Sequence, residues 1–171
     1  MQMLTMDTAA RETLIDGLLA AARETIVQVP FCWVDTPTPD GAGANARVVN
    51  AQSGRLGEDF WTRWFLTPRI GRKATEIQAT GRVTLAYQHE SGNAYVALTG
   101  PAELIDDREE VDSRFRGSVY DDAEGITAAS LIAVKVTADH LELHVRGVTA
   151  EPWGRGRTLL DRDTKKIWHL A

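Results

Sequence analysis

The sequence predicts a mainly β protein, an antiparallel sheet or barrel with helices at its periphery. Apolar and polar residues alternate in several short segments, most clearly from Val83 to Tyr87, as they do in a half-buried strand. Turn-forming residues such as Ser91-Gly92-Asn93 separate these segments into pairs. Helical segments do not alternate regularly with the strands, which disfavours a doubly wound parallel sheet.

The first half of the chain is expected to open with a helix and to continue mainly as strands. Apolar residues recur at spacings of three and four between Thr8 and Val27, which is the period of an amphipathic helix. Pro30 ends that pattern. We then expect three strands, at Phe31 to Asp35, Ala46 to Ala51 and Trp61 to Thr67, with a loop rich in turn residues at Thr36 to Gly43 between the first two. A short helix is expected at Gly71 to Thr80.

The second half is expected to contain two more strand pairs around a helix. An ambiguous stretch runs through Gly125, and the chain closes with a tail that includes Trp153 to Arg157 and an apolar stretch from Ile167 to Leu170. The expected strands are Arg82 to Gln88, Tyr95 to Ile105, Leu131 to Val136 and Leu141 to Val145, and the expected helix is Asp106 to Phe115.

Length and composition predict one globular domain over residues 1–171. A chain of this length buries roughly two thirds of the surface that its unfolded form exposes, and 43% hydrophobic with 25% charged residues is ordinary globular composition. The formal net charge is -5, so the surface as a whole does not generate the positive field that attracts nucleic acid. Any site for an anion must therefore be local.

Cysteine content and apolar runs predict a cytoplasmic protein. Cys32 is the single cysteine, which excludes an intrachain disulfide and is typical of a reducing compartment. The first residues lack the basic and apolar regions of a signal peptide. The longest apolar runs are far shorter than the roughly 18 residues that a membrane span needs, so no membrane partner is expected.

One segment, Trp64 to Ile77, has the pattern of a phosphate site. A strand ends at Thr67, a loop contains Gly71, and a helix begins with Arg72 and Lys73. Backbone N–H groups at a helix start carry partial positive charge, a threonine hydroxyl can donate a hydrogen bond, and two cations can neutralise a dianion. Basic residues at a helix start are also common as solvated surface groups, so the pattern alone leaves both interpretations open.

The segment resembles the FMN-phosphate segment of pyridoxamine 5'-phosphate oxidase-like proteins, in which an aromatic strand ending in threonine precedes a small-Arg-Lys helix start. The resemblance covers most of the chain. Arg47 to Ala51 resembles the family's stretch beside the isoalloxazine ring, and Val83 to Tyr87 with Tyr95 to Asp107 resembles its central hairpin. This resemblance implies an FMN-binding split β-barrel of the general stress protein branch, and a homodimer in which each cofactor site is built from two subunits.

The same resemblance implies which residues bind the cofactor. The flavin would be lined by Arg47, Val48 and Val49. Arg47 would reach the phosphate or the ring, and a positive charge near the ring would stabilise the anionic reduced flavin. Leu66 would pack against the flavin, and Thr67 would hydrogen-bond to it.

Three further residues complete this implied cofactor set. Arg72 and Lys73 would grip the phosphate, and Tyr95 stands where the oxidases commonly place a glutamine that faces the cofactor of the partner subunit. The resemblance assigns no catalytic residue in this chain.

Two departures bear on activity. The oxidases recognise pyridoxamine phosphate through a C-terminal arginine-leucine-histidine-aspartate-arginine motif, whereas this chain has an extra residue and no histidine between Arg157 and Arg162. Oxidation of pyridoxamine phosphate is therefore not expected. His144 stands near a position where relatives often have a tryptophan. Arg155 and Arg157, in the tail, are either solvated or folded over the cofactor, and the sequence leaves both open.

Two function classes follow from the resemblance. The first is a flavin-dependent oxidoreductase that uses FMN, or alternatively FAD or a deazaflavin, with an unknown small-molecule donor or substrate. The second is a non-catalytic protein on the same fold that stores or senses flavin or holds haem. The four histidines show no metal-ligand spacing, so no metal is expected. The large aromatic residues are interpreted as core or dimer interface: Trp33, Trp61, Trp64 and Phe65.

Overall fold

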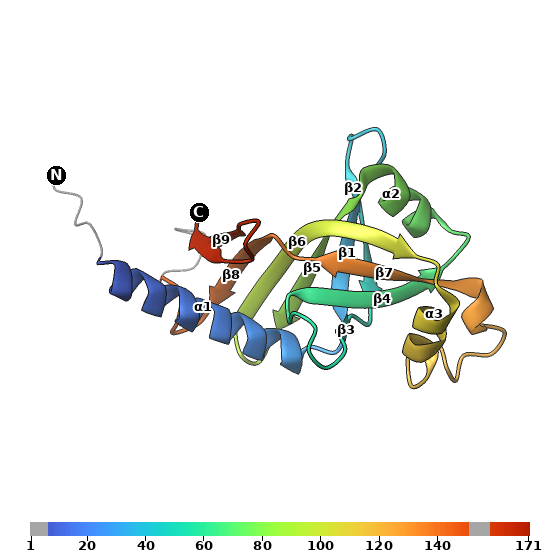
Figure 1. The fold of residues 1–171 in the computed structure, drawn as a ribbon, viewed down its shortest axis with the longest axis horizontal. Helices are drawn as coiled ribbons and strands as arrows, with labels where there is room; N and C mark the ends of the chain where they lie inside the picture. Colours follow the sequence, from blue (N-terminus) through green and yellow to red (C-terminus); the bar gives the residue numbers. More distant parts are fainter. Residues whose placement is uncertain (1–6, 151–157) are drawn as a thin grey trace.

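The strands form a single antiparallel sheet that curls into a half-barrel, with helices around it (Figure 1). The computed structural model describes residues 7–150 and 158–171. The strand order along the main path is β10-β9-β8-β6-β5-β1-β2, and β7 joins β6 to β4, which pairs with β3. The strands are β1 Cys32–Pro37, β2 Ala44–Val49, β3 Gln52–Ser53, β4 Thr62–Pro68, β5 Arg82–His89, β6 Ala94–Ile105, β7 Leu131–Thr137, β8 His140–Val145, β9 Thr158–Arg162 and β10 Trp168–Leu170. This architecture confirms the predicted fold class.

The alternation of apolar and polar residues in the sequence matches the burial pattern of the central strands. On β5 the side chains of Val83, Leu85 and Tyr87 are buried, while those of Thr84 and Ala86 between them are half-buried on the opposite face. The sheet therefore has an inner face, which closes around the core, and an outer face.

β6 belongs to both halves of the curled sheet. Its first part, Ala94 to Thr99, pairs with β8, and its last part, Ala102 to Ile105, pairs with β7. Gly100 lies between the two parts, where a β-carbon would stand 2.0 Å from the backbone oxygen of Thr137. Only glycine allows β6 to approach the β7–β8 connection this closely.

The curled sheet is open between β2 and β4. Among the described strands, β2 pairs only with β1, and β3 covers β4 only at Arg63 and Trp64. Each of these strands therefore has a free edge that borders the opening, and this opening makes the barrel a split one.

Helices close the ends and the inner face of the half-barrel. α1 (Thr8–Gln28) contacts β5, β6, β8 and β10, α2 (Arg72–Thr80) contacts β1, β4 and β6, and α3 (Arg108–Phe115) contacts β4 and β7. A 3-10 turn, η1 (Ala128–Ser130), precedes β7. The main core lies between α1 and the inner face of the sheet, and a second cluster beneath α3 contains Trp64, Leu66, Val111, Ala128, Leu131 and Ala133.

The structure differs from the sequence-based elements mainly at short segments. β2 ends at Val49 and not at Ala51, because the chain turns there and the Asn50 side chain donates a hydrogen bond to the Pro30 carbonyl oxygen at 2.6 Å. α3 begins at Arg108, after Asp107, whose carboxylate accepts from the Glu110 N–H at 2.8 Å. The two-residue β3 and the short β9 were not expected.

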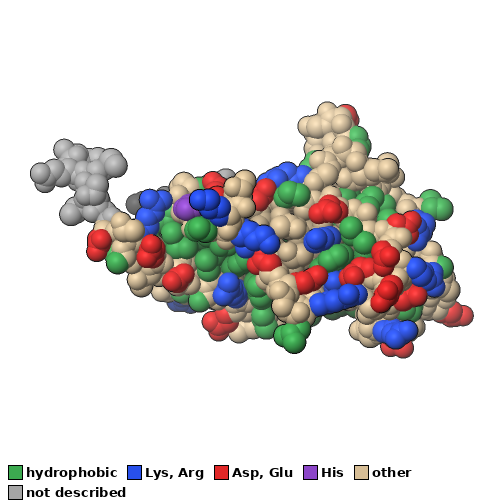
Figure 2. Space-filling view, in the orientation of Figure 1, with side chains coloured by type: hydrophobic (Ala, Val, Ile, Leu, Met, Phe, Trp, Pro, Cys, Tyr) green, Lys and Arg blue, Asp and Glu red, His purple; other side chains and the backbone are tan. Residues whose placement is uncertain are grey.

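The surface carries both signs of charge. On the face seen in Figure 2, basic and acidic side chains are interspersed over β4, β7 and α3 and do not form one broad basic area. No helix in residues 7–150 or 158–171 has the length and apolar character needed to span a membrane.

Candidate functional site

A buried carboxylate, Glu76 of α2, joins the helix to the β1–β2 hairpin. Thr36 and Asn45 are cross-strand partners on that hairpin, and Arg47 lies two residues beyond Asn45 on the same face. Glu76 accepts hydrogen bonds from Thr36 Oγ1 at 2.5 Å and from Asn45 Nδ2 at 2.7 Å. Arg47 Nη1 lies 2.8 Å from Glu76 Oε2 and also donates to Thr36 Oγ1 at 2.5 Å. The carboxylate therefore fixes the position of Arg47.

Two cations, Arg47 and Arg72, pair with this carboxylate, and a third, Lys73, lies near Arg47. Arg72, mostly exposed, places its Nε 3.5 Å from Glu76 Oε1. The pKa of Lys73 is lowered, first by burial and then by the positive charge of Arg47. The pKa of Glu76 is lowered, chiefly by the hydrogen bond from Arg47. Three positive side chains and one negative one leave a formal charge of +2 in a chain of net charge -5, so the cluster is a local site for an anion.

Two further features of the cluster favour an anion. Arg47 Nη2 is buried and has no hydrogen-bond partner among the described residues, and an unpaired buried donor of this kind is costly. The residue that caps α2, Gly71, has no side chain and makes no capping hydrogen bond. The first N–H groups of α2 therefore lack a side-chain acceptor, and such groups at a helix start favour an anion.

Thr67 and Leu66, at the end of β4, project to opposite faces. Phe65 and Thr67 share the inner face by strand alternation, and Lys73 Nζ lies 5.6 Å from the centre of the Phe65 ring. Thr67 is therefore on the side of β4 that faces Lys73. The Leu66 side chain is buried in the second core cluster beneath α3, so any contact of Leu66 with a ligand in the opening must use its backbone.

The backbone groups of Val48 and Leu66 face the opening from its two sides. Arg69 N–H donates to the Ser130 carbonyl, and Thr38 N–H donates to the Gly43 carbonyl. In an antiparallel sheet, every second residue of a strand directs its backbone N–H and C=O to the same neighbouring strand, and the residues between direct theirs to the other side. Arg69 therefore bonds toward β7, and Thr38 bonds toward β2. Leu66, three residues before Arg69, therefore directs its N–H and C=O away from β7, and Val48 directs its own away from β1.

The valine side chains of β2 lie on different faces. The Val48 side chain is 53% exposed on the outer face, whereas that of Val49 is buried in the main core. α2 contacts β1 on one side of the opening and β4 on the other, so the cation cluster stands at one end of the opening.

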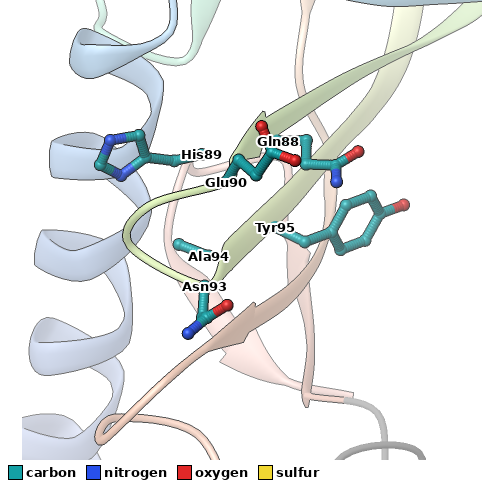
Figure 3. A pocket seen from close by; sticks show the side chains of 6 residues that line it. All are labelled: Gln88, His89, Glu90, Asn93, Ala94 and Tyr95. Carbon is teal, nitrogen blue, oxygen red and sulfur yellow. The ribbon is translucent and has the colours of Figure 1, made fainter.

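Tyr95 is not brought to the cation cluster within one chain. Arg47 shares the inner face of β2 with the core residue Val49, whereas Tyr95 alternates with the core residue Val96 on β6 and lies on the outer face. Tyr95 lies on the outer face opposite Gln88 and His144. It lines a small pocket at the β5–β6 turn, where its ring and the Gln88 side chain lie together and His89 points toward α1 (Figure 3).

Sequence reasoning found the cations but missed the groups that hold them. Thr36, Asn45 and Glu76 were not expected in the site. One signal was present in the sequence: Glu76 follows Arg72 by four residues, the spacing of an ion pair on one helix face. Within the described ranges, no three His, Cys, Asp or Glu side chains are grouped so that they could hold a metal ion.

The comparisons with known proteins identify the family of the chain. The model of the family described as "Pyridoxamine 5'-phosphate oxidase like" matches residues 23–143, which is more than half of the chain. The chain belongs to the pyridoxamine 5'-phosphate oxidase-like family. The matched range includes the cation cluster and both edges of the opening. No curated protein matches the chain.

Several solved structures share the fold at low sequence identity. A protein related to general stress protein 26 of B. subtilis, from Clostridium acetobutylicum, is 15% identical at TM-score 0.62 and covers 88% of this chain and 95% of that one. A pyridoxamine 5'-phosphate oxidase-related, FMN-binding protein from Nostoc punctiforme is 16% identical at TM-score 0.57, with 95% and 96% covered. PhzG from Burkholderia lata 383, in complex with tetrahydrophenazine-1-carboxylic acid, is 19% identical at TM-score 0.63, with 94% and 90% covered.

In this chain Arg162, an arginine near the C-terminus, is bonded to other residues of the domain. Arg162 of β9 forms an ion pair with Asp59 at 2.5 Å and lies over the Trp168 ring at 5.5 Å, so its side chain is held in the structure of the domain. Trp153, Arg155 and Arg157 lie outside the described residues. His144 lies on the outer face of β8, with its Nδ1 3.4 Å from Thr149 Oγ1.

Proposed function

We propose that this chain binds FMN, with the phosphate at the cation cluster on α2 and the ring along the opening between β2 and β4. The observation that carries the proposal is the formal charge of +2 on the cluster, in which Arg47 and Arg72 pair with Glu76 and Lys73 lies near Arg47. A phosphate monoester carries about two negative charges at pH 7. It would therefore neutralise the cluster and give the unpaired Arg47 Nη2 an acceptor.

The cluster residues have separate roles in this proposal. Arg47 and Lys73 pair with the phosphate from the inner side, and Arg72 does so from the surface. The first N–H groups of α2 supply further donors, and the Thr67 hydroxyl, on the inner face of β4, donates one more. Glu76 does not touch the phosphate; it is a positioning residue that orients Arg47 through the Thr36 and Asn45 contacts.

The ring would lie between the two free strand edges. The backbone N–H and C=O groups of Val48 and Leu66 face the opening, and a flavin offers donors and acceptors along its pyrimidine edge. Val49 closes the opening from the core side, and Arg47, fixed by Glu76, supplies positive charge at one end. A bound flavin would supply the redox chemistry, whereas the chain supplies binding, orientation and charge.

A flavin-dependent oxidoreductase is the function that this arrangement supports best. The electron donor or substrate is a small molecule that reaches the ring from the opening. Pyridoxamine phosphate is not the expected substrate, because the C-terminal arginine that matches best, Arg162, is paired with Asp59. Cys32 is a buried free thiol, which supports a reducing cytoplasmic location as part of the proposal.

The proposal includes a homodimer built on the outer face of the sheet. The strand register places a row of apolar side chains across four strands, β2, β1, β5 and β6, and the large ones are half exposed: Trp33 is 52% and Val48 53% exposed. The row consists of Val48, Trp33, Ala86 and Ala97. An apolar row with two half-exposed large side chains favours association, and the two alanines, of which Ala97 is buried, would allow close approach. Tyr95, on the same face, would then meet the partner subunit.

The visible absorption spectrum of the purified protein tests the proposal. We expect a flavin spectrum, or uptake of added FMN with quenching of its fluorescence, and mass spectrometry should identify FMN in the released small molecules. Reduction of the bound flavin by NAD(P)H would support an enzyme, and a flavin that no donor reduces would support storage or sensing. A protein that is colourless and takes up no FMN, or that shows a haem Soret band instead, would overturn the proposal.

A further inference from the structure

A second, smaller site lies at the turn between β5 and β6. It is a pocket of about 260 Å³ (Figure 3), a volume just below the usual range of drug-sized sites, so its ligand must be compact. The pocket is lined by Gln88, His89, Glu90, Asn93, Ala94 and Tyr95. None of the residues of the cation cluster on α2 and β2 lines it.

Three polar side chains of this pocket have no partner in the described part of the chain. The Gln88 and Asn93 amides and the Glu90 carboxylate make no hydrogen bond or ion pair with residues 7–150 or 158–171. His89 differs, because its Nε2 lies 3.2 Å from Ser91 Oγ and its ring points toward α1. Polar groups that gather at one hollow and that the fold does not use are available to a ligand.

The strand register brings these polar groups beside an aromatic ring. Gln88 and Tyr95 are cross-strand partners on the outer face, and directly opposed side chains in a sheet lie about 5 Å apart. The Glu90 carboxylate lies on the same side of the hairpin as the Gln88 amide and the Tyr95 ring (Figure 3). The pocket therefore combines one carboxylate, an amide and one aromatic ring.

The charge of the pocket selects a cation. Glu90 is the only described lining residue with a formal charge, since histidine is counted as neutral. A carboxylate holds the parallel N–H groups of a guanidinium with two hydrogen bonds, an amide oxygen accepts a further N–H group, and the face of a tyrosine ring attracts the cation. An anion would be repelled by Glu90, and an apolar ligand would leave the polar groups unpaired.

We propose that this pocket binds a small organic cation with a guanidinium group. The Glu90 carboxylate pairs with the guanidinium, the Gln88 amide oxygen accepts another of its N–H groups, and the Tyr95 ring covers one of its faces. Ala86 and Ala97 of the apolar row are the next outer-face residues of β5 and β6, so the ligand lies at the border of the proposed homodimer interface. The inference does not depend on a flavin, because the pocket shares no residue with the cation cluster.

Calorimetric titration of the full chain with butylguanidine tests the proposal. We expect saturable binding with a dissociation constant of about 1 mM or lower, and binding at least about tenfold weaker for butylurea, which has the same shape and no charge. Glu90→Gln keeps the shape of the side chain and should weaken butylguanidine binding at least about tenfold. Glu12→Gln, the same change at an exposed position of α1, should bind as the wild type does.

The outcomes separate this inference from the proposed function. No saturable binding of butylguanidine, equal binding of butylurea, or full affinity in Glu90→Gln would each overturn the inference. Protein that takes up FMN and binds no butylguanidine leaves the flavin site standing, whereas protein that binds butylguanidine and takes up no FMN overturns the proposed function alone.

Discussion

Arg47 of β2 and Glu76 of α2 form the ion pair that ties the β1–β2 hairpin to the helix, with 2.8 Å between Arg47 Nη1 and Glu76 Oε2. Glu76 is only 3% exposed, so its charge depends on the partners that surround it. The carboxylate anchors the hairpin, and it also offsets one of three positive charges. The stability of this part of the fold and the charge of the candidate site therefore depend on the same residue.

Reversing the charge at Lys73 is expected to weaken FMN binding while leaving the fold intact. Lys73→Glu removes one cation and adds an anion beside the phosphate, and we expect affinity to fall at least about 100-fold. Lys73→Met keeps the apolar stem over Phe65 and should lose about tenfold. Fluorescence titration measures both. Lys165→Glu, at an exposed turn, should have no effect, and full FMN affinity in Lys73→Glu would remove Lys73 from the site.

Removing the charge of Glu76 is expected to destabilise the protein. Glu76→Gln leaves Arg47 without its carboxylate partner. Because the Arg47 side chain remains about 20% exposed, we expect a loss of about 2 kcal/mol in the free energy of unfolding. Urea unfolding at pH 7 measures it. Gln78→Ala, an exposed change on the same helix, should cost less than about 0.5 kcal/mol and serves as the control.

The ion pair of Arg47 and Glu76 also predicts how the stability difference between wild type and Glu76→Gln varies with pH. The pKa of Glu76 is lowered from its ordinary value of 4.5, chiefly by the Arg47 hydrogen bond. A lowered carboxyl pKa contributes stability that is present above the unfolded pKa and is lost as pH falls toward the folded one. The difference between wild type and Glu76→Gln should therefore be constant from pH 7 to about 5 and shrink below about 4.5. A difference that stays constant to pH 3 would contradict this assignment.

A charge on the outer face is expected to disrupt the proposed homodimer. Trp33→Glu changes a half-exposed side chain in the centre of the apolar row, so the isolated chain should still fold. Burying an unpaired carboxylate between two copies is costly, and we expect a monomer in sedimentation equilibrium with FMN binding weakened at least about tenfold. Ile167→Glu, an equally exposed apolar side chain at another surface, should remain a dimer. A Trp33→Glu dimer would show that the interface lies elsewhere.

Adding one methyl group at Gly100 is expected to destabilise the junction of the two half-sheets. The new β-carbon would stand 2.0 Å from the Thr137 backbone oxygen, so either β6 or the β7–β8 connection must move, at a cost of about 3 kcal/mol or more. Thermal unfolding of Gly100→Ala measures this loss. Gly17→Ala on α1, where nothing lies within 4 Å, should be neutral or stabilising by up to about 1 kcal/mol. Equal effects of the two changes would contradict the close approach at Gly100.

Most of the fold could be predicted from the sequence, because its central elements have strong local periods. The alternation from Val83 to Tyr87 and the helical spacing after Thr8 each specify one buried face, and the structure confirms both elements. β9 was not predicted, because its five residues, Thr158 to Arg162, alternate only weakly and it forms by pairing with β8 and β10. β3 has only two residues, too few for any period.

The candidate site could be predicted only in part. The cations Arg72 and Lys73 follow one another in the chain, and their pattern with Thr67 is visible in the sequence. Thr36 and Glu76 are 40 residues apart and meet only when α2 packs on the hairpin. Neither residue has a local signal of that contact. Strand alternation also fixes which Leu66 atoms can reach a ligand, and this depends on register, which the sequence alone does not specify.

The opening between β2 and β4 also has a consequence for the protein before it binds a ligand. The backbone groups that Val48 and Leu66 direct into it belong to strand edges that, at these positions, have no neighbouring strand among residues 7–150 and 158–171. Such edges invite pairing with strands of other molecules. A flat ligand seated in the opening would cover both edges at once. Supply of cofactor during synthesis would then protect the chain from aggregation, and yield of intact protein from cells would depend on how much flavin they make.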